Sequence, residues 1–261
     1  MKYAFIEYER EKKSRMSEWA VSFIKPFTAE NINVFGCEGV SVKINVRKDA
    51  DDETVKRAVK KTRRFLAQND VSYTAGEEIE GIPIADGRAL MALMTFRYAD
   101  FSKRAAVLCG ERNITDIVLC ALCPRVRSIS LYGYRGDRDE TDEYFFREYG
   151  INIQHIKKTE YRELFSADLV VDCRKEGKTL SGLKKYAYVS LSEEAQKPQK
   201  WLFDGEKIEF SPKGSELTAD KAECVLGVMS DDFLKLSDEG ICIEEKLKIA
   251  ENMGMSALTS H

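Results

Sequence analysis

The sequence predicts an α/β protein in which a doubly wound parallel sheet follows a smaller α+β domain and precedes carboxy-terminal helices. From about residue 103 onward, short apolar runs alternate with helical patterns. Strands separated by helices of this length pair in parallel. Before that point apolar and polar residues alternate, which is typical of strands with one buried face. A chain of 261 residues has room for two such domains.

The amino-terminal part, residues 1–95, predicts an α+β domain that ends in a linking helix. Its expected elements are strands over residues 2–9, 34–46 (with a turn at Glu38 and Gly39) and 71–74, and helices over residues 14–24 and 51–68. Pro26 ends the first helix, since a proline cannot continue it. The linking helix, ALMALMTF, follows Asp86, which stands where a helix N-cap is expected.

The next part, residues 96–215, predicts the parallel sheet. Its expected elements are strands over residues 105–109, 128–132, 151–156, 169–173 and 186–191, and helices over residues 114–123 and 140–149. WLFDGEKIEF, residues 201–210, predicts a hairpin that turns at Asp204 and Gly205. Helices over residues 218–236 and 243–253 predict a last segment, residues 216–261, that packs back on the interdomain cleft.

Charge and apolar content exclude several classes of protein. A formal net charge of -3 provides no general attraction for nucleic acid. The apolar runs are too short to span a membrane, and the first ten residues do not resemble a signal peptide. We therefore expect a cytoplasmic protein with no nucleic-acid and no membrane partner. A small-molecule ligand and a homo-oligomer stay open, and the basic run over residues 56–64 is a solvated helix face or an anion-binding surface.

Cysteine and histidine usage predicts no metal site. Seven cysteines is an odd count, and they fall in apolar segments, so we expect reduced thiols. Cys120 and Cys123 have C-x-x-C spacing within an apolar helix, where buried packing is the simpler interpretation. The chain has two histidines, of which His155 lies in a strand pattern and His261 is the last residue.

The stretch RAAVLCGERNITDIVLCALC, residues 104–123, reads as a strand, a turn and a helix. In a doubly wound sheet the ligand lies beyond the carboxyl ends of the strands, at the point where the strand order reverses. A dinucleotide loop usually carries three glycines, and here Gly110 alone is present, followed by Glu111. Asn113 and Thr115 can supply donors or caps at the helix amino terminus. A working pyrophosphate site and a purely structural turn both stay open.

The end of the second strand of this part, SLYGYRGDRDE, follows Gly110 by about 20 residues. Dinucleotide-binding folds place there an acid for the ribose hydroxyl of NAD or an arginine for the 2′-phosphate of NADP. Arg135 and Arg138 can serve a phosphate, whereas Asp137 and Asp139 can equally cap the next helix.

The run from RAAVLCGE through SISLYGYR to ADLVVDCRKEG, residues 167–177, resembles the nicotinamide-binding domain of the shikimate and quinate dehydrogenases and of glutamyl-tRNA reductase. IADGRALMAL, residues 84–93, is similar to the segment that opens the linking helix in the shikimate dehydrogenases. The resemblance implies a Rossmann-like domain that holds NAD or NADP, with Cys173 among the cofactor contacts. It also implies that Asp86 and Lys48 stand at the catalytic positions of an oxidoreductase acting on a small molecule. The alternative is a non-enzymatic protein that lost the cofactor and binds a partner or senses a ligand.

Overall fold

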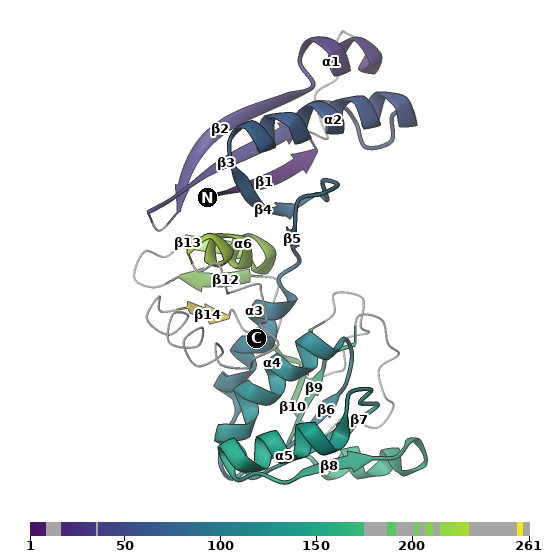
Figure 1. Ribbon diagram of the computed structural model, residues 1–261, viewed down its shortest axis with the longest axis vertical. Coiled ribbons are helices and arrows are strands. Elements are labelled where there is room, and N and C mark those ends of the chain that lie inside the picture. Colours follow the sequence, from purple (N-terminus) through teal and green to yellow (C-terminus); the bar gives the residue numbers. More distant parts are fainter. Residues whose placement is uncertain are drawn as a thin grey trace. The chain divides into compact units, whose positions relative to one another are not determined.

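The computed structural model describes residues 1–8, 17–34, 36–174, 187–191, 201–203, 207–210, 215–229 and 255–257 (Figure 1). These residues form two compact units. The first contains Met1–Gly87 together with helix α6 (Ala219–Met229) from Asp220 onward, and the second begins at Arg88. Both units combine helices with parallel strands, so the predicted α/β class is confirmed. The predicted division at residues 95 and 215 stays a prediction.

The first unit is built on a five-stranded sheet. Its strands are β1 (Lys2–Tyr8), β2 (Phe27–Val34), β3 (Cys37–Ile44), β4 (Val71–Gly76) and β5 (Ile84–Ala85), and its helices are α1 (Glu18–Ile24), α2 (Asp52–Gln68) and α6. The strand order is β2-β3-β1-β4-β5. β3, β1, β4 and β5 are parallel, whereas β2 is antiparallel to β3. The carboxyl ends of the four parallel strands therefore lie along one edge.

Two apolar layers cover this sheet. Ala58 and Leu66 of α2 pack against Ile6 and Ile44 on one layer. The other layer joins Tyr3 and Phe5, which alternate with Ile6 along β1, to Cys224 and Val225 of α6. Side chains of successive strand residues point to opposite faces, so β1 contributes to both layers.

The expected turn at Glu38 and Gly39 is wrong, because both residues lie in β3, the second strand of a hairpin formed by β2 and β3. β2 begins directly after Pro26, and the turn falls at Gly36, where φ is +83°. Gly39 lies inside β3, and a Cβ there would stand 2.3 Å from the ring of Tyr3. The glycine at position 39 thus leaves room for the Tyr3 ring on the neighbouring strand, and it does not form a turn.

The second unit contains a six-stranded sheet. Its strands are β6 (Arg104–Leu108), β7 (Ser128–Tyr132), β8 (Ile153–Ile156), β9 (Leu169–Asp172), β10 (Ala187–Ser190) and β11 (Trp201–Phe203). All neighbouring strands are parallel, in the order β11-β10-β9-β6-β7-β8. Counted from β6, this is the order 6-5-4-1-2-3, which is that of the doubly wound dinucleotide-binding fold.

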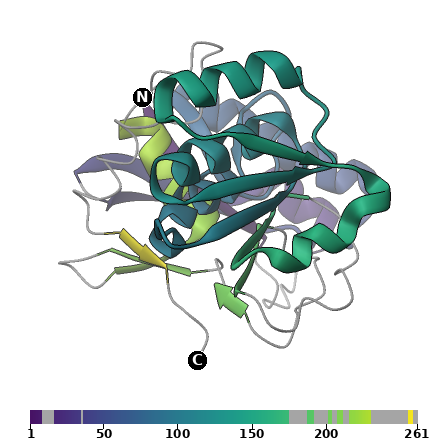
Figure 2. The same cartoon turned by 90° about the horizontal axis from the view of Figure 1, so that it is seen from below.

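Helices accompany this sheet on both sides (Figure 2). They are α3 (Arg88–Met94), α4 (Arg112–Leu122) and α5 (Arg138–Tyr149), with 3₁₀ segments η1 (Thr95–Tyr98), η2 (Cys123–Arg125) and η3 (Lys158–Ser166). β6 and β9 are the central strands, and their side chains are almost all buried. The Rossmann-like architecture expected for this part is therefore present.

The predicted hairpin over residues 201–210 is wrong. β11 pairs with β10 as the outermost strand of the six-stranded sheet. β12 (Lys207–Phe210) instead pairs with β13 (Ser215–Thr218) and β14 (Met255–Ala257) in a separate antiparallel sheet. The predicted helix over residues 218–236 is described as far as Met229, in α6, and the one over residues 243–253 lies outside the described residues.

Candidate functional site

The carboxyl edge of the six-stranded sheet is the candidate site, because the strand order reverses between β6 and β9. The Cys109 N–H donates to the Tyr132 carbonyl (2.9 Å), and the Cys173 N–H donates to the Leu108 carbonyl (2.9 Å). These bonds bring together the turn from β6 to α4, the turn from β7 to α5 and the residues that follow β9.

The turn from β6 to α4 is closely packed at Gly110. A Cβ at this position would lie 2.1 Å from the carbonyl oxygen and 2.6 Å from the carbonyl carbon of Cys173. The Gly110 N–H donates to Oγ1 of Thr115 (3.2 Å), whose side chain is fully buried. Glycine is therefore required by the close approach of two strand ends, and Thr115 holds the turn from the inside.

An ion pair lies beside this turn. Arg88, the first residue of α3, has a side chain that is only 8% exposed. Its Nη2 donates to the Cys173 carbonyl (2.8 Å), and its Nη1 lies 3.1 Å from Oε1 of Glu111. Glu111 is the N-cap residue of α4, but its side chain makes no capping hydrogen bond. The amino terminus of α4 therefore keeps its electropositive character, with Asn113 exposed in the first turn.

The residues after β9 form a compensated charge cluster. The carboxylate of Asp172, which is almost fully buried, accepts hydrogen bonds from Nε (2.8 Å) and Nη2 (2.7 Å) of Arg174. The Tyr188 hydroxyl donates to the same carboxylate. Burial raises the pKa of the Cys173 thiol well above its ordinary value, so this thiol stays protonated and is a poor nucleophile. Cys173 contributes to the edge through its backbone carbonyl.

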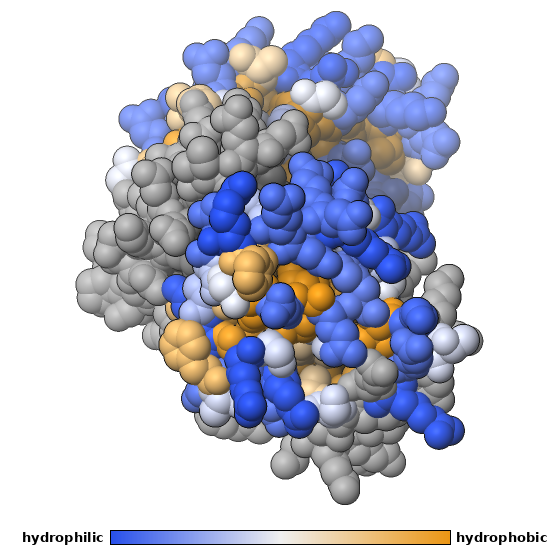
Figure 3. Space-filling view, turned by 60° about the horizontal axis from the view of Figure 1, so that its bottom comes forward, coloured by the Kyte–Doolittle hydropathy of each residue, from blue (hydrophilic) through white to orange (hydrophobic). Residues whose placement is uncertain are grey.

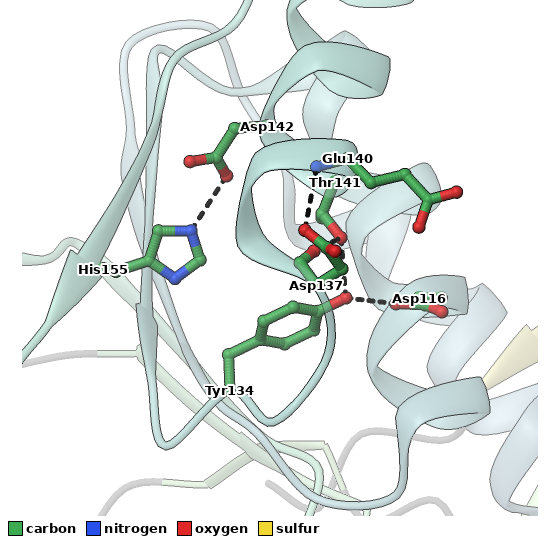
Figure 4. A network of polar contacts seen from close by, with 7 residues as sticks. All are labelled: Asp116, Tyr134, Asp137, Glu140, Thr141, Asp142 and His155. Atoms are coloured by element: carbon green, nitrogen blue, oxygen red, sulfur yellow. Dashed lines mark hydrogen bonds and ion pairs between the residues drawn. The ribbon is translucent and has the colours of Figure 1, made fainter.

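A hydrogen-bond network stabilises the turn from β7 to α5 (Figure 4). The Tyr134 hydroxyl lies 2.8 Å from Oγ1 of Thr141 and 3.5 Å from Oδ1 of Asp116. Thr141 in turn donates to the Asp137 carbonyl (2.6 Å), and the Asp137 side chain caps α5 by accepting from the Glu140 N–H (3.2 Å). Burial raises the pKa of Asp116, and the turn is tied to α4 through this carboxyl.

A second contact in Figure 4 joins His155 of β8 to Asp142 of α5, with Nε2 and Oδ1 2.8 Å apart. The His155 ring lies 5.9 Å from the Tyr134 ring, and its Nδ1 is buried without a hydrogen-bond partner among the described residues. The sequence indicated a partly buried strand residue, and the structure adds Asp142 as its partner. This contact lies on the outermost strand on this side of the sheet, away from the reversal point.

Arg135 stands outside this network on the same turn. Its side chain is exposed and, within the described part of the chain, makes no hydrogen bond or ion pair. Gly133, two residues earlier, has φ +81° and open space around the position of a Cβ. The turn thus presents a guanidinium that has no partner among the described residues, one strand away from Gly110. Such a group binds phosphate or carboxylate groups well.

The first unit places Lys48 and Asp86 at the carboxyl edge of its own sheet. Lys48 follows β3, and Asp86, which is exposed, follows β5. Nζ of Lys48 lies 3.0 and 2.9 Å from the two carboxylate oxygens of Glu77, which follows β4, and 5.7 Å from the Tyr8 ring centroid. The topology brings the two predicted residues to one edge, and Glu77 compensates the charge of Lys48.

Sequence reasoning did not identify Arg88, Glu77 or Asp172 as parts of these edges. Arg88 could have been recognised from the sequence, because it is a charged residue directly before the apolar run ALMALM. Among the residues that the structure describes, no three His, Cys, Asp or Glu side chains are grouped to hold a metal ion. In the same part of the chain, no helix is long and apolar enough to cross a membrane.

No protein-family model matches the chain, and no curated protein sequence matches it. Solved structures give weak similarities. Aspartate transcarbamoylase from Trypanosoma cruzi is 11% identical with a TM-score of 0.38, over 75% of this chain and 73% of that one. A putative aspartate carbamoyltransferase from Leishmania major is 12% identical with a TM-score of 0.35, over 73% and 71%. A chorismate mutase/shikimate 5-dehydrogenase fusion protein from Clostridium acetobutylicum is 13% identical with a TM-score of 0.26, over 96% and 97%. Similarities of this size do not assign a function.

Proposed function

We propose that the six-stranded unit binds a nicotinamide dinucleotide and favours NADP over NAD. The observation that carries the proposal is Arg135, an exposed guanidinium with no partner in the described part of the chain, at the end of the second strand of a sheet with dinucleotide-binding order. In such sheets an arginine near this position accommodates the 2′-phosphate. The electropositive first turn of α4, with Asn113, would face the pyrophosphate.

The residues fit the two halves of this ligand unequally. The glycine that would allow close approach of a pyrophosphate is already pressed against the Cys173 backbone. Glu111 adds a carboxylate near the same place, although Arg88 compensates its charge. Among the described residues, no comparable close contact is found at Arg135, where the 2′-phosphate would bind. We therefore expect the 2′-phosphate to contribute more to affinity than the pyrophosphate does.

The activity that goes with this ligand is oxidation or reduction of a small molecule, as the resemblance to shikimate dehydrogenases implies. The dinucleotide, when bound, supplies the hydride, and the chain supplies orientation and charge. Lys48 and Asp86 are the candidate substrate-contacting residues of the first unit. Lys48 would have to exchange its contact with Glu77 for one with the substrate.

A second candidate is a Rossmann-like protein that binds no dinucleotide and acts through a partner or another ligand. The packed turn at Gly110 and the Arg88–Glu111 pair favour it, because together they occupy space that a pyrophosphate would otherwise approach. The two candidates share the fold and differ in the site.

Thermal unfolding with NADP, NADPH, NAD and NADH separates the candidates. A ligand that binds only the folded state stabilises that state, by about 3 kcal/mol at a concentration of about 100 times Kd. Such a ligand therefore raises Tm. We expect NADP or NADPH to raise Tm more than NAD or NADH. Arg135→Ala should abolish the difference, whereas Arg127→Ala, an exposed arginine just before the other end of β7, should retain it. No shift with any of the four at millimolar concentration would favour the second candidate.

A further inference from the structure

The first unit exposes a cluster of large apolar side chains on α1. Trp19 is 60% exposed, Phe23 45% and Ile24 72%, while α1 buries only Val21 and Ser22. These are three of the seven large apolar side chains exposed among the described residues, and they fall within one helix of seven residues. Single exposed apolar side chains need no explanation, but a cluster of this kind marks an interaction surface.

Two cations of α2 contact Phe23 of this cluster. The guanidinium carbon of Arg57 lies 4.1 Å from the Phe23 ring centroid. Nζ of Lys61 lies 5.4 Å from the same centroid and donates to the Phe23 carbonyl (2.7 Å). Arg57, Lys60, Lys61 and Arg64 are three or four residues apart, so they share one face of α2. The apolar cluster of α1 and this basic face of α2 are joined at Phe23, and we call the two together the α1–α2 surface.

The positive charge of this surface is poorly compensated. Lys60 and Arg64 are exposed and have no hydrogen-bond or ion-pair partner in the part of the chain that the structure describes. After its first turn α2 carries six Lys and Arg residues and no Asp or Glu. The nearby carboxylate of Glu18 on α1 is held by Arg47, through its backbone N–H (3.0 Å) and Nε (3.5 Å). A partner for this surface must therefore be anionic and must also accept apolar side chains.

We propose that the α1–α2 surface binds an anionic lipid membrane. Tryptophan and phenylalanine are favoured at the level of the headgroups, and an aliphatic side chain enters the acyl boundary. Lys and Arg beside them are attracted to anionic headgroups. The α1–α2 surface belongs to the first unit and is separate from the proposed nucleotide site of the second unit. The proposal differs from the sequence-based expectation that the protein has no membrane partner.

A lipid surface fits better than a nucleic acid. Ile24, the most exposed side chain of the cluster, gains nothing from stacking on a base. The Phe23 ring is already covered by the Arg57 guanidinium and lies edge-on to Trp19, at 4.7 Å between centroids.

Vesicle binding of the full chain tests the proposal, with phosphatidylcholine vesicles that contain or lack phosphatidylserine. Trp19 serves as reporter in a Trp201→Phe background, because the chain has two tryptophans. We expect co-sedimentation and a blue shift of Trp19 fluorescence with the phosphatidylserine vesicles only, weakened by added salt. Lys60→Glu combined with Arg64→Glu should weaken binding by about tenfold or more. Ile24→Ser should weaken it at unchanged net charge.

Two matched controls should bind as the unsubstituted chain does. Phe101→Ser removes a 73% exposed apolar side chain of the second unit, and Arg127→Glu reverses an exposed charge there. Figure 3 shows one face of the molecule, on which most described residues are hydrophilic and a smaller number of apolar residues are exposed among them. Absence of binding to phosphatidylserine vesicles, equal binding to phosphatidylcholine, or equal losses in the controls would overturn the proposal. Binding of single-stranded RNA without vesicle binding, lost in the same α2 variant, would replace it with a nucleic-acid surface.

Discussion

Two neighbouring turns at the carboxyl edge of the six-stranded sheet differ in how they are filled. At the turn from β6 to α4, Gly110 is packed against Cys173, and Arg88 pairs with Glu111. The turn from β7 to α5 is held by Tyr134 from inside and presents Arg135 to solvent. Neighbouring turns of one sheet thus differ in whether their polar groups contact each other or face solvent. We propose that ligand recognition, if the nucleotide binds, depends on the second turn.

Substituting the two glycines tests this difference most strongly. Gly110→Ala should lower the free energy of unfolding by about 3 kcal/mol, because the new Cβ would overlap backbone atoms of Cys173 that cannot move aside. Gly133→Ala should lower it by about 1 kcal/mol, since only the left-handed backbone conformation at φ +81° opposes it. Urea unfolding of both variants measures the two losses. A smaller loss for Gly110→Ala than for Gly133→Ala would show that the first turn is not packed as described.

The Arg88–Glu111 pair offers a smaller test of the same contrast. Arg88→Met should lower the free energy of unfolding by about 2 kcal/mol, because it removes a hydrogen bond from a buried guanidinium to the Cys173 carbonyl. Glu111→Gln should lower it by less than about 1 kcal/mol, since the Glu111 side chain is half exposed. Urea unfolding measures both changes. Equal decreases in the free energy of unfolding for the two variants would contradict the conclusion that Arg88 contributes more to stability than Glu111 does.

The pH dependence of Asp116 tests the inner side of the second turn. Burial raises the pKa of this carboxyl above its ordinary 3.8, so the folded chain binds the proton more tightly than the unfolded chain. The resulting stabilisation is complete below the ordinary pKa and is lost as pH rises through the raised pKa. Relative to Asp116→Asn, the unsubstituted chain should therefore lose Tm between about pH 4 and neutrality. If the Tm difference between the unsubstituted chain and Asp116→Asn stayed constant as pH rises over this range, or if it changed in favour of the unsubstituted chain, the buried position of Asp116 would be contradicted.

The sequence predicted five strands of the six-stranded sheet, because they are short apolar runs bounded by turn residues, and it missed the role of β11. β7 has the expected bounds, and β6 and β9 differ from them by one residue. β2 escaped prediction because it is an outer strand of mostly partly exposed or exposed residues that starts right after Pro26. Its neighbour Gly39 was interpreted as a turn, although it makes room for the ring of Tyr3.

Only those parts of the candidate site that depend on residues close together in the sequence could be predicted. Gly110 and Arg135 were located from the order of strand, turn and helix. The contact of Arg88 with Cys173 joins residues 85 positions apart, and no local pattern indicates it. The same limit applies to Lys48 and Glu77, 29 positions apart on two different loops. Their charges are compensated through the fold and not through neighbouring residues of the sequence.

Calorimetric titration with adenosine 2′,5′-bisphosphate and with adenosine 5′-monophosphate tests the central claim most directly, because neither ligand carries the pyrophosphate that would approach the packed turn. We predict that the bisphosphate binds at least about tenfold more tightly than the monophosphate. Arg135→Ala should remove that difference and Arg127→Ala should retain it. Equal affinities for the two ligands, or a preference that survives Arg135→Ala, would contradict recognition of a phosphate by the turn from β7 to α5.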